Sequence, residues 1–532
     1  MRTVLNIMAM IRLLGIFFLI ASLPNLAASQ LIQPARAELE VSLLDDEHYI
    51  IPGGEWGLLV SQRNRKESTF KDDAYDLVLF DTLLQEQWRT QILIESKYKY
   101  RGFEQEGGKY YMLFVHEGNK KAEYTIVSID AETSLSRLYS LKNDMAMELT
   151  EFTVLGNLVI FGGYVNYRPS VFAFDIYTEQ LKVLPGLYDK NSELIEVRAN
   201  PLQQSFTVLY TEVLPNRQHT ISSKTYDSEA NPVLEYKLQP EEGMHLLYGR
   251  TTQFSDSAVH IAGTYAPKNS DYSQGIYISS VYGNGEQSIK YYPFTELENF
   301  FVFMSEKRQK RVKQKIKRRN DQRRSLNLNY RLLVHDIVPH TDQYILLAEA
   351  FYPKYNAGGP MNLNSRGFRD ASQNYLEGYK YTHAVLLGFD GSGKLLWDNG
   401  FEINEVVQPT LEKLVHVLPA DDQIVLVYAY ENELQTKIIS NNTVLAGKES
   451  NALQLVDYLG ETRDDGNGYI ELHDWYGNSL YAYGEQRIKN PDGSEDNNRR
   501  VFFINKITYQ PISAEELQKA DSSKLLNEGM KE

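Results

Sequence analysis

The feature that most constrains the fold of this chain is an internal repeat of about 50 residues. Five segments read as a strand, a turn that contains an aspartate, and a second strand: 75–94, 124–141, 170–187, 219–238 and 383–403. The turn aspartates are Asp81, Asp130, Asp175, Asp227 and Asp390. Their separations are 49, 45, 52 and 163 residues, and the last is close to three further repeats. Hairpins without the aspartate occur at 274–294, 436–456 and 500–509.

Two more strand-like runs precede each hairpin, for example 205–213 and 423–431, and both are rich in Val, Tyr and Phe or Ile. Four strands per 50 residues predict an all-β chain that forms a single β-propeller over residues 38–512. We count eight four-stranded blades, with seven as the alternative. The eighth unit ends after its third strand, so we expect residues 37–44 to supply the fourth. Ser513 and Glu516 form a capping box that predicts a short helical tail over 513–532.

One hairpin turn resembles the blades of quinoprotein-like and other bacterial propellers. Asp390, Gly393, Lys394 and Trp397 are similar to the D-x-x-x-G-K-x-x-W turn of those blades, but with one residue fewer before the glycine. Asp81 and Trp88 repeat the spacing without the Gly-Lys pair. The resemblance implies a tryptophan that packs between blades. It carries over no quinone-binding residue, and it extends to the fold alone.

The N-terminal segment predicts export. Two arginines precede an apolar run over 13–23, and Pro24 ends that run, which is typical of a secretory signal over residues 1–29 with cleavage as late as position 37. The alternative is an uncleaved segment that anchors the chain to the inner membrane. The sequence contains no cysteine, which suits a bacterial envelope better than an animal secretory route. We therefore expect a periplasmic or extracellular protein.

Motifs for catalysis or cofactors do not emerge. Without cysteine there is no thiol nucleophile, iron–sulfur ligation or cysteine zinc site, and the ten histidines include no H-E-x-x-H pair. G-x-S-x-G and P-loop sequences are missing as well. Asp492, Ser494 and Asp496 alternate as calcium ligands do, but the EF-hand glycine is lacking, so a solvated turn is the preferred interpretation. We expect no cofactor and leave the catalytic residues unassigned.

Two insertions interrupt the repeats around the sixth unit. The first, residues 295–326, is predicted to be a helix because Thr295 and Glu298 form a capping box and no Gly or Pro follows before its end. Residues 307–324 hold eleven Lys and Arg against one Asp, a local charge of +10 in a chain of −15, which leaves −25 for the rest. The candidate partner-binding residues of this helix are Lys307, Arg308, Lys310, Arg311, Lys313, Lys315, Lys317, Arg318 and Arg319.

A narrow apolar stripe of Phe301, Met304, Val312 and Ile316 is expected to dock this helix on the propeller and to leave its basic side free. The second insertion, residues 353–380, separates the second and third strands of the same unit. Its aromatic and arginine side chains are typical of recognition surfaces. The candidates there are Tyr355, Arg366, Phe368, Arg369, Tyr375 and Tyr379. In a propeller, both insertions leave the ring on the same face, where loops usually carry function.

These features favour an exported, non-catalytic scaffold or recognition module of the cell envelope. The expected partner is an anionic envelope component or an acidic protein, with peripheral membrane contact through the basic helix. Export argues against nucleic acid despite the density of Lys and Arg. A solvated helix, offset by the acidic body, is the competing interpretation of the basic run. The alternative function is an enzyme that acts on carbohydrate or another polar polymer through carboxylates at the central channel.

Overall fold

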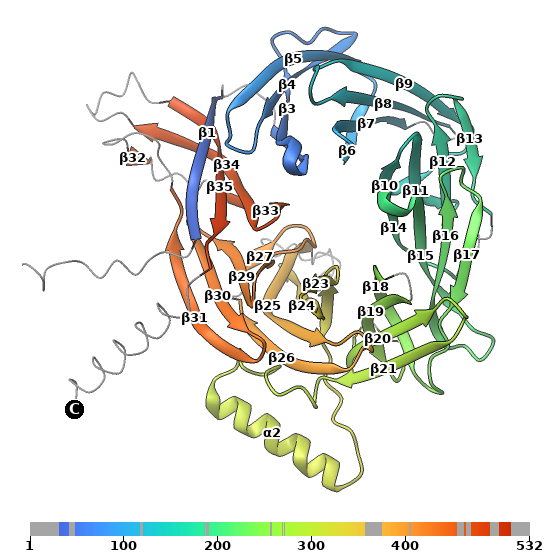
Figure 1. The fold of residues 1–532 in the computed structure, drawn as a ribbon, viewed down its shortest axis with the longest axis vertical. Helices are drawn as coiled ribbons and strands as arrows, with labels where there is room; N and C mark the ends of the chain where they lie inside the picture. The colour runs from blue at the N-terminus through green and yellow to red at the C-terminus, as the bar shows by residue number, and fades with distance from the viewer. Residues whose placement is uncertain are drawn as a thin grey trace, which may run out of the picture.

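The computed structural model is a ring of eight β-sheets around a central channel, and each sheet is a blade of four main strands (Figure 1). It describes residues 31–41, 48–117, 121–185, 187, 191–255, 258–268, 270, 272–356, 375–403, 406–454, 462–463, 470–489 and 499–511. The eight-bladed propeller predicted from the repeats is confirmed. The four main strands of a blade run from the channel to the outer rim, as β10 to β13 do (Figure 1).

Blade one holds β2 (His48–Pro52), β3 (Leu58–Asn64), β4 (Asp72–Phe80) and β5 (Glu86–Glu95), and blade two holds β6 (Lys99–Glu106), β7 (Lys109–Glu117), β8 (Ala122–Asp130) and β9 (Ser136–Asn143). Blade three holds β10 (Glu148–Leu155), β11 (Leu158–Val165), β12 (Arg168–Asp175) and β13 (Gln180–Val183), and blade four holds β14 (Leu194–Asn200), β15 (Ser205–Val213), β16 (His219–Asp227) and β17 (Pro232–Lys237). Short 3-10 turns occur at Gly54–Trp56 and Pro201–Gln203.

Blade five holds β18 (His245–Ser255), β19 (Ala258–Ala266), β20 (Gly275–Tyr282) and β21 (Gln287–Pro293). Blade six holds β22 (Arg331–Val334), β23 (Val338–His340), β24 (Gln343–Asn356), β25 (Tyr375–Phe389), β26 (Leu395–Glu402) and β27 (Val407–Gln408). Blade seven holds β28 (His416–Ala420), β29 (Gln423–Tyr430), β30 (Glu433–Ser440) and β31 (Thr443–Ala452), and blade eight holds β32 (Thr462–Arg463), β33 (Ile470–Tyr476), β34 (Ser479–Lys489), β35 (Arg499–Tyr509) and β1 (Leu31–Glu40).

The N-terminal strand closes the ring, as expected, but over residues 31–40 rather than 37–44. β1 pairs antiparallel with β35, from Leu31 opposite Tyr509 to Glu40 opposite Val501, and becomes the outer strand of blade eight. Arg36 donates from Nη1 to Asn505 Oδ1 at 2.8 Å, which ties β1 to β35 through side chains as well. Closure therefore joins the two ends of the propeller in one sheet and removes an open strand edge.

The repeated aspartates build the turns between the third and fourth strands. Asp81 Oδ1 accepts hydrogen bonds from the backbone N–H of Leu83 and Gln85 at 2.8 and 2.9 Å, and the other four aspartates accept in the same way within their own turns. The third residue after Asp81 and Asp390 has a positive φ, 57° at Leu84 and 75° at Gly393. A glycine relieves the strain there, which explains the Gly of the quinoprotein-like turn.

The tryptophans of the two quinoprotein-like turns pack between blades, as the resemblance implies. Trp88 of blade one donates from Nε1 to the carbonyl of Ala131 in blade two at 2.7 Å. Trp397 is buried in an apolar cluster that joins blades six and seven, and its Nε1 donates to Gln343 Oε1 at 2.7 Å. Both rings therefore fill the wedge between neighbouring sheets.

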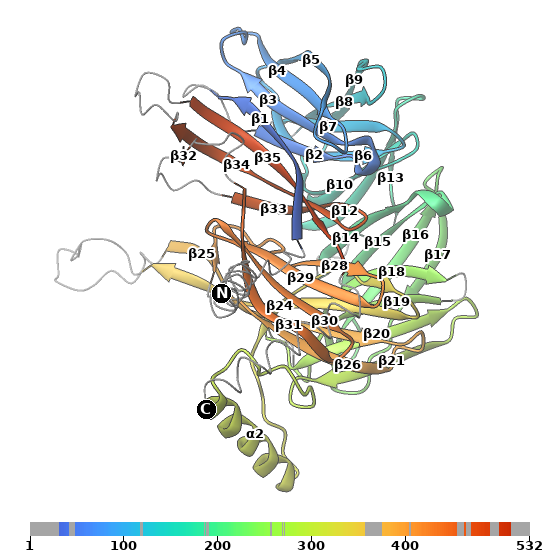
Figure 2. The ribbon, with the colours of Figure 1, turned by 60° about the vertical axis from the view of Figure 1, so that its left-hand side comes forward.

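The long connection from blade five to blade six carries the α-helix α2 (Glu306–Asp321), which lies outside the ring of blades (Figures 1 and 2). The helix begins at Glu306, so the predicted start at Thr295 is wrong. Asp398 of β26 accepts from the backbone N–H of Glu298 and Asn299 at 3.0 and 2.7 Å and holds this stretch as a series of turns. Within the described ranges, no helix has both the length and the apolar character needed to span a bilayer.

Candidate functional site

The four apolar residues expected to dock the helix do pack on the propeller, but only Val312 and Ile316 lie on α2, whereas Phe301 and Met304 lie in the turns before it. Ile316 is buried with Phe301 in a core cluster of blades five and six, and Met304 and Val312 pack against that cluster. Glu306 lies in the first turn, and Arg318 and Arg319 lie in the last, which suits the helix dipole. The stripe fixes the helix in place, so its remaining faces are presented in one orientation.

The basic side chains of α2 occupy those remaining faces. Eight of the nine predicted binding residues on the helix are exposed and Arg319 is half-buried; the exposed ones are Lys307, Arg308, Lys310, Arg311, Lys313, Lys315, Lys317 and Arg318. Among the described residues, no acidic side chain forms an ion pair with any of them. Lys313 donates to the carbonyl of Glu298 at 3.5 Å. Within the described ranges, the helix thus presents a basic array without ion pairs to acidic side chains.

The second insertion is described only at its two ends. Tyr355, near the end of β24, is 58% exposed, and Tyr379 on β25 is half-buried. Tyr375 begins β25. Arg366, Phe368 and Arg369 lie outside the described residues, as do Asp492, Ser494 and Asp496. Successive strands in a blade are antiparallel, so β21 and β24 end at the same face and both insertions leave the ring there.

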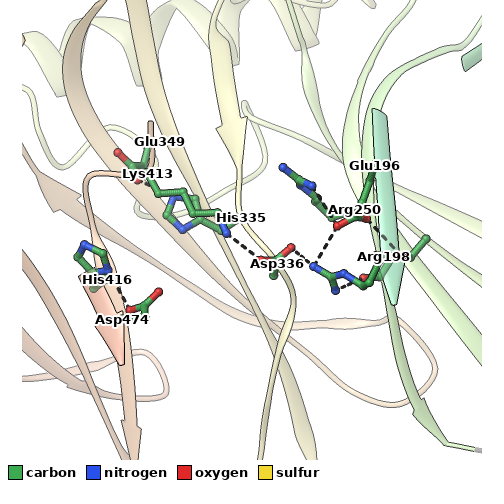
Figure 3. A network of polar contacts seen from close by, with 10 residues as sticks. Glu196, Arg198, Arg250, His335, Asp336, Glu349, Lys413, His416 and Asp474 are labelled. Carbon is green, nitrogen blue, oxygen red and sulfur yellow. Dashed lines mark hydrogen bonds and ion pairs between the residues drawn. The ribbon is translucent and has the colours of Figure 1, made fainter. Parts of the chain in front are cut away.

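The inner strands carry a network of charged side chains that sequence analysis does not single out (Figure 3). Glu196 and Arg198 of β14, Arg250 of β18 and Asp336 of the β22–β23 bend belong to blades four, five and six. Arg250 Nη1 donates to Glu196 Oε1 at 3.0 Å, and Arg198 also pairs with Glu196. The network therefore joins three blades at the channel wall.

Asp336 is the centre of this network. Arg198 of blade four donates to one carboxylate oxygen, and Lys413, which precedes β28 of blade seven, donates to the other at 2.7 Å. Burial opposes the ionisation of Asp336, but the charges of Lys413 and Arg198 outweigh it and hold its pKa well below the usual range. The carboxylate of Asp336 thus connects blades four, six and seven. Its partners Arg198 and Lys413 are 138 and 77 residues away in the sequence.

Two histidine–carboxylate pairs lie beside Asp336 (Figure 3). His335 Nε2 is 2.5 Å from Glu349 Oε1, and the fully buried Glu349 also accepts from the backbone N–H of Leu414 and Val415 at 2.9 and 3.1 Å. His416 Nδ1 is 2.9 Å from Asp474 Oδ1.

The sequence favours structural, hydrogen-bonded histidines. Their acidic partners are 14 and 58 residues away, so no local motif points to these pairs. A carboxylate that orients an imidazole in this way is suited to proton transfer.

A second group of carboxylates lies on the inner strands of blades two and three. Glu104 of β6 accepts from Thr153 Oγ1 of β10 at 3.0 Å, and burial raises its pKa to about 7. Burial also raises the pKa of Glu151. The channel wall therefore gathers acidic residues from several blades, as the enzyme alternative expects, although Glu196 and Asp336 pair with Arg or Lys and Glu349 and Asp474 pair with histidines. In the described parts of the chain, no three His, Asp or Glu side chains are arranged to hold a metal ion.

Comparison with known proteins identifies no family. No family model and no curated protein matches the chain. Similar solved structures include the β-propeller domain of the Trilobed protease from Pyrococcus furiosus, with 10% identity, coverage of 77% of this chain and 93% of that chain, and a TM-score of 0.35. The polysaccharide lyase Uly1 shows 7% identity, coverage of 77% and 89%, and a TM-score of 0.36. These values support no argument about function, and the eight-bladed β-propeller is established by the strand pairing of the chain itself.

Proposed function

We propose that this propeller is an exported, non-catalytic recognition module of the cell envelope that binds an anionic surface through α2. The observation that carries the proposal is the set of eight exposed Lys and Arg side chains on a helix that is docked by its apolar stripe. Lys and Arg near an anionic membrane each contribute about 1 kcal/mol of binding free energy at short range. An array of eight is therefore sufficient for peripheral attachment.

The docking of α2 on the propeller supports partner binding, because the basic side chains of the helix are ordered before a partner arrives. A run with this density of like charge repels itself, and as an isolated segment it would lose conformational entropy on binding. In the folded chain, Ile316 and Val312 fix the helix before any partner arrives. The acidic body, at −25 outside residues 307–324, would turn away from the same surface and orient the molecule with α2 towards it.

The remaining parts of the proposal rest on the sequence. Tyr355 and Tyr379, with Arg366, Phe368, Arg369 and Tyr375, are proposed as further contacts on the same face. Export rests on residues 1–29, which lie outside the described residues, as does the predicted tail at 513–532. An acidic protein is the other class of partner that this array would bind.

Charge reversal on α2 tests the proposal. Lys310, Arg311 and Lys317 are replaced by Glu, and the matched control replaces the exposed Lys66, Lys71 and Arg137, which lie on blades one and two. Both proteins are sedimented with vesicles of phosphatidylglycerol and phosphatidylcholine at low and high salt. We expect the α2 variant to lose at least about 100-fold in vesicle affinity and the control to lose far less.

High salt should release the wild-type protein, because exposed charges are screened. Equal binding of wild-type and α2 variant at low salt would refute the proposal. If the wild-type protein instead captures an acidic protein from envelope extracts and does not bind vesicles, that acidic protein, and not the membrane surface, is the partner.

A further inference from the structure

A groove of about 800 Å³ opens at the mouth of the channel over blades four to six, apart from the basic faces of α2. It lies where β18 and β22 begin and β24 ends, which is the face from which both insertions leave the ring. This volume falls within the range of about 300–1,000 Å³ that is usual for small-molecule sites. Its lining includes Tyr248, Thr264, Ser273, Arg331, Phe351 and Tyr379.

Aromatic rings form one wall of the groove. Tyr379 meets Phe351 edge-on, with ring centroids 5.8 Å apart, and both side chains are half-buried. Tyr248, also half-buried, approaches from blade five. The guanidinium of Arg331, which lines the groove, lies 5.1 Å above the ring of Tyr272, which is 42% exposed and precedes the lining residue Ser273. The groove thus offers several partly exposed ring surfaces within one site.

Neutral hydrogen-bonding groups line the same groove. Ser273 Oγ donates to the carbonyl of Tyr330 at 2.8 Å and retains acceptor capacity, and Thr211 Oγ1 accepts from the Glu193 N–H at 2.9 Å and retains a proton to donate. Thr264 adds a third hydroxyl. Glu193 and Arg331 balance each other in charge. The lining is therefore suited to a ligand rich in hydroxyl groups and close to neutral.

The bottom of the groove is continuous with the charged network of the channel. The Tyr248 ring lies 5.5 Å from the Arg250 guanidinium, and Leu333 and Val334, which line the groove, directly precede His335 and Asp336. The groove therefore borders the charged network through Tyr248, Leu333 and Val334.

We propose that this groove binds a short segment of a neutral glycan. A sugar ring has an apolar C–H face that packs on an aromatic ring and hydroxyl groups at its edge that need donors and acceptors, and the groove supplies both. An extended peptide would add a strand along a free sheet edge. The bridge between Ser273 and Tyr330 occupies that edge where β22 begins. The groove shares Tyr379 with the further contacts proposed above but includes no residue of α2, so this proposal does not depend on membrane binding through the helix.

Titration with cellohexaose, hexa-N-acetylchitohexaose and an acidic hexagalacturonate, followed by calorimetry on the full chain, tests the proposal. We expect at least one neutral hexasaccharide to bind and Tyr379→Ala to weaken it at least about tenfold. Tyr379→Phe, which keeps the ring, should retain most of the affinity. Tyr177→Ala is the matched control, because Tyr177 is 64% exposed in a hairpin turn of blade three.

Phe351→Leu gives a second variant if Tyr379→Ala does not fold, and it should also weaken binding because Phe351 lines the groove. The absence of binding by both neutral sugars at about 10 mM would overturn the proposal. So would binding confined to hexagalacturonate, or an equal loss of affinity in Tyr177→Ala and Tyr379→Ala.

Discussion

The imidazole ring of His383 lies parallel to the phenyl ring of Phe303, with centroids 3.7 Å apart and an angle of 8° between the planes. Phe300 and Tyr330 meet the same imidazole edge-on at 5.1 and 5.7 Å. His383 belongs to β25 of blade six, whereas the three other rings belong to the connection that carries α2. This aromatic cluster therefore anchors the insertion beside the start of the helix.

Removing Phe303 should release that anchor. Phe303→Ala deletes a half-buried ring, so we expect the free energy of unfolding to fall by about 2–3 kcal/mol. Urea unfolding measures this loss, and hydrogen exchange should become faster over residues 295–304. Phe70→Ala is the control, because Phe70 is 97% exposed and should change stability by less than about 0.5 kcal/mol. Equal losses in both variants would contradict the anchoring role.

His383 should make this anchor sensitive to acid. Burial lowers its pKa to about 3, below about 6.5 in the unfolded chain, so the folded state favours the neutral ring. Its contribution to stability is complete above pH 6.5 and is lost as the pH falls towards 3. His383→Phe should therefore lose less stability than the wild type between pH 7 and pH 4. A difference between the two proteins that stays constant over this range would exclude this titration as the cause.

Glu104 should make stability depend on pH in the opposite direction to His383. Burial raises its pKa to about 7, so its neutral form is favoured in the fold, and the stability it contributes below pH 4.5 is lost as the pH rises through 7. Glu104→Gln should raise the melting temperature at pH 8 and change it little at pH 4.5. Glu132→Gln, at an exposed turn, is the control and should show no such pH dependence. The same gain at both pH values would refute the raised pKa.

Loss of β1 should open the ring. Deletion of residues 1–40 removes the partner of β35 and leaves its edge and the buried Phe503 uncovered. We expect a lower melting temperature and self-association in sedimentation, because an unpaired strand edge pairs with other chains. A synthetic peptide of residues 31–41 should restore the monomer, and deletion of 1–30 should be tolerated. A 1–40 deletion that stays monomeric and melts normally would contradict closure by β1.

The sequence indicates the blades because each depends on local chemistry. The aspartate turns, such as those at Asp81 and Asp390, are completed by backbone groups two to four residues away. The apolar and basic positions of α2 can be predicted for the same reason, since they follow from residues close together in the sequence. The start of α2 is different, since Glu298 and Asn299 are held by Asp398, which is about 100 residues away. The capping box at Thr295 is a local pattern, so it cannot reveal that Asp398 competes for these backbone N–H groups.

By itself, the sequence determined the repeat and the basic character of the helix, favoured eight blades over seven, and indicated closure by an N-terminal strand, although at 37–44 rather than at Leu31–Glu40. Only the tertiary structure decided which polar groups meet, as in the pairs Arg198–Asp336 and His416–Asp474, and that Tyr248 and Tyr379 share one groove. The physical reason is that these side chains belong to different blades. They converge only after closure of the ring places the inner strands around one channel, and no spacing along the chain encodes that geometry.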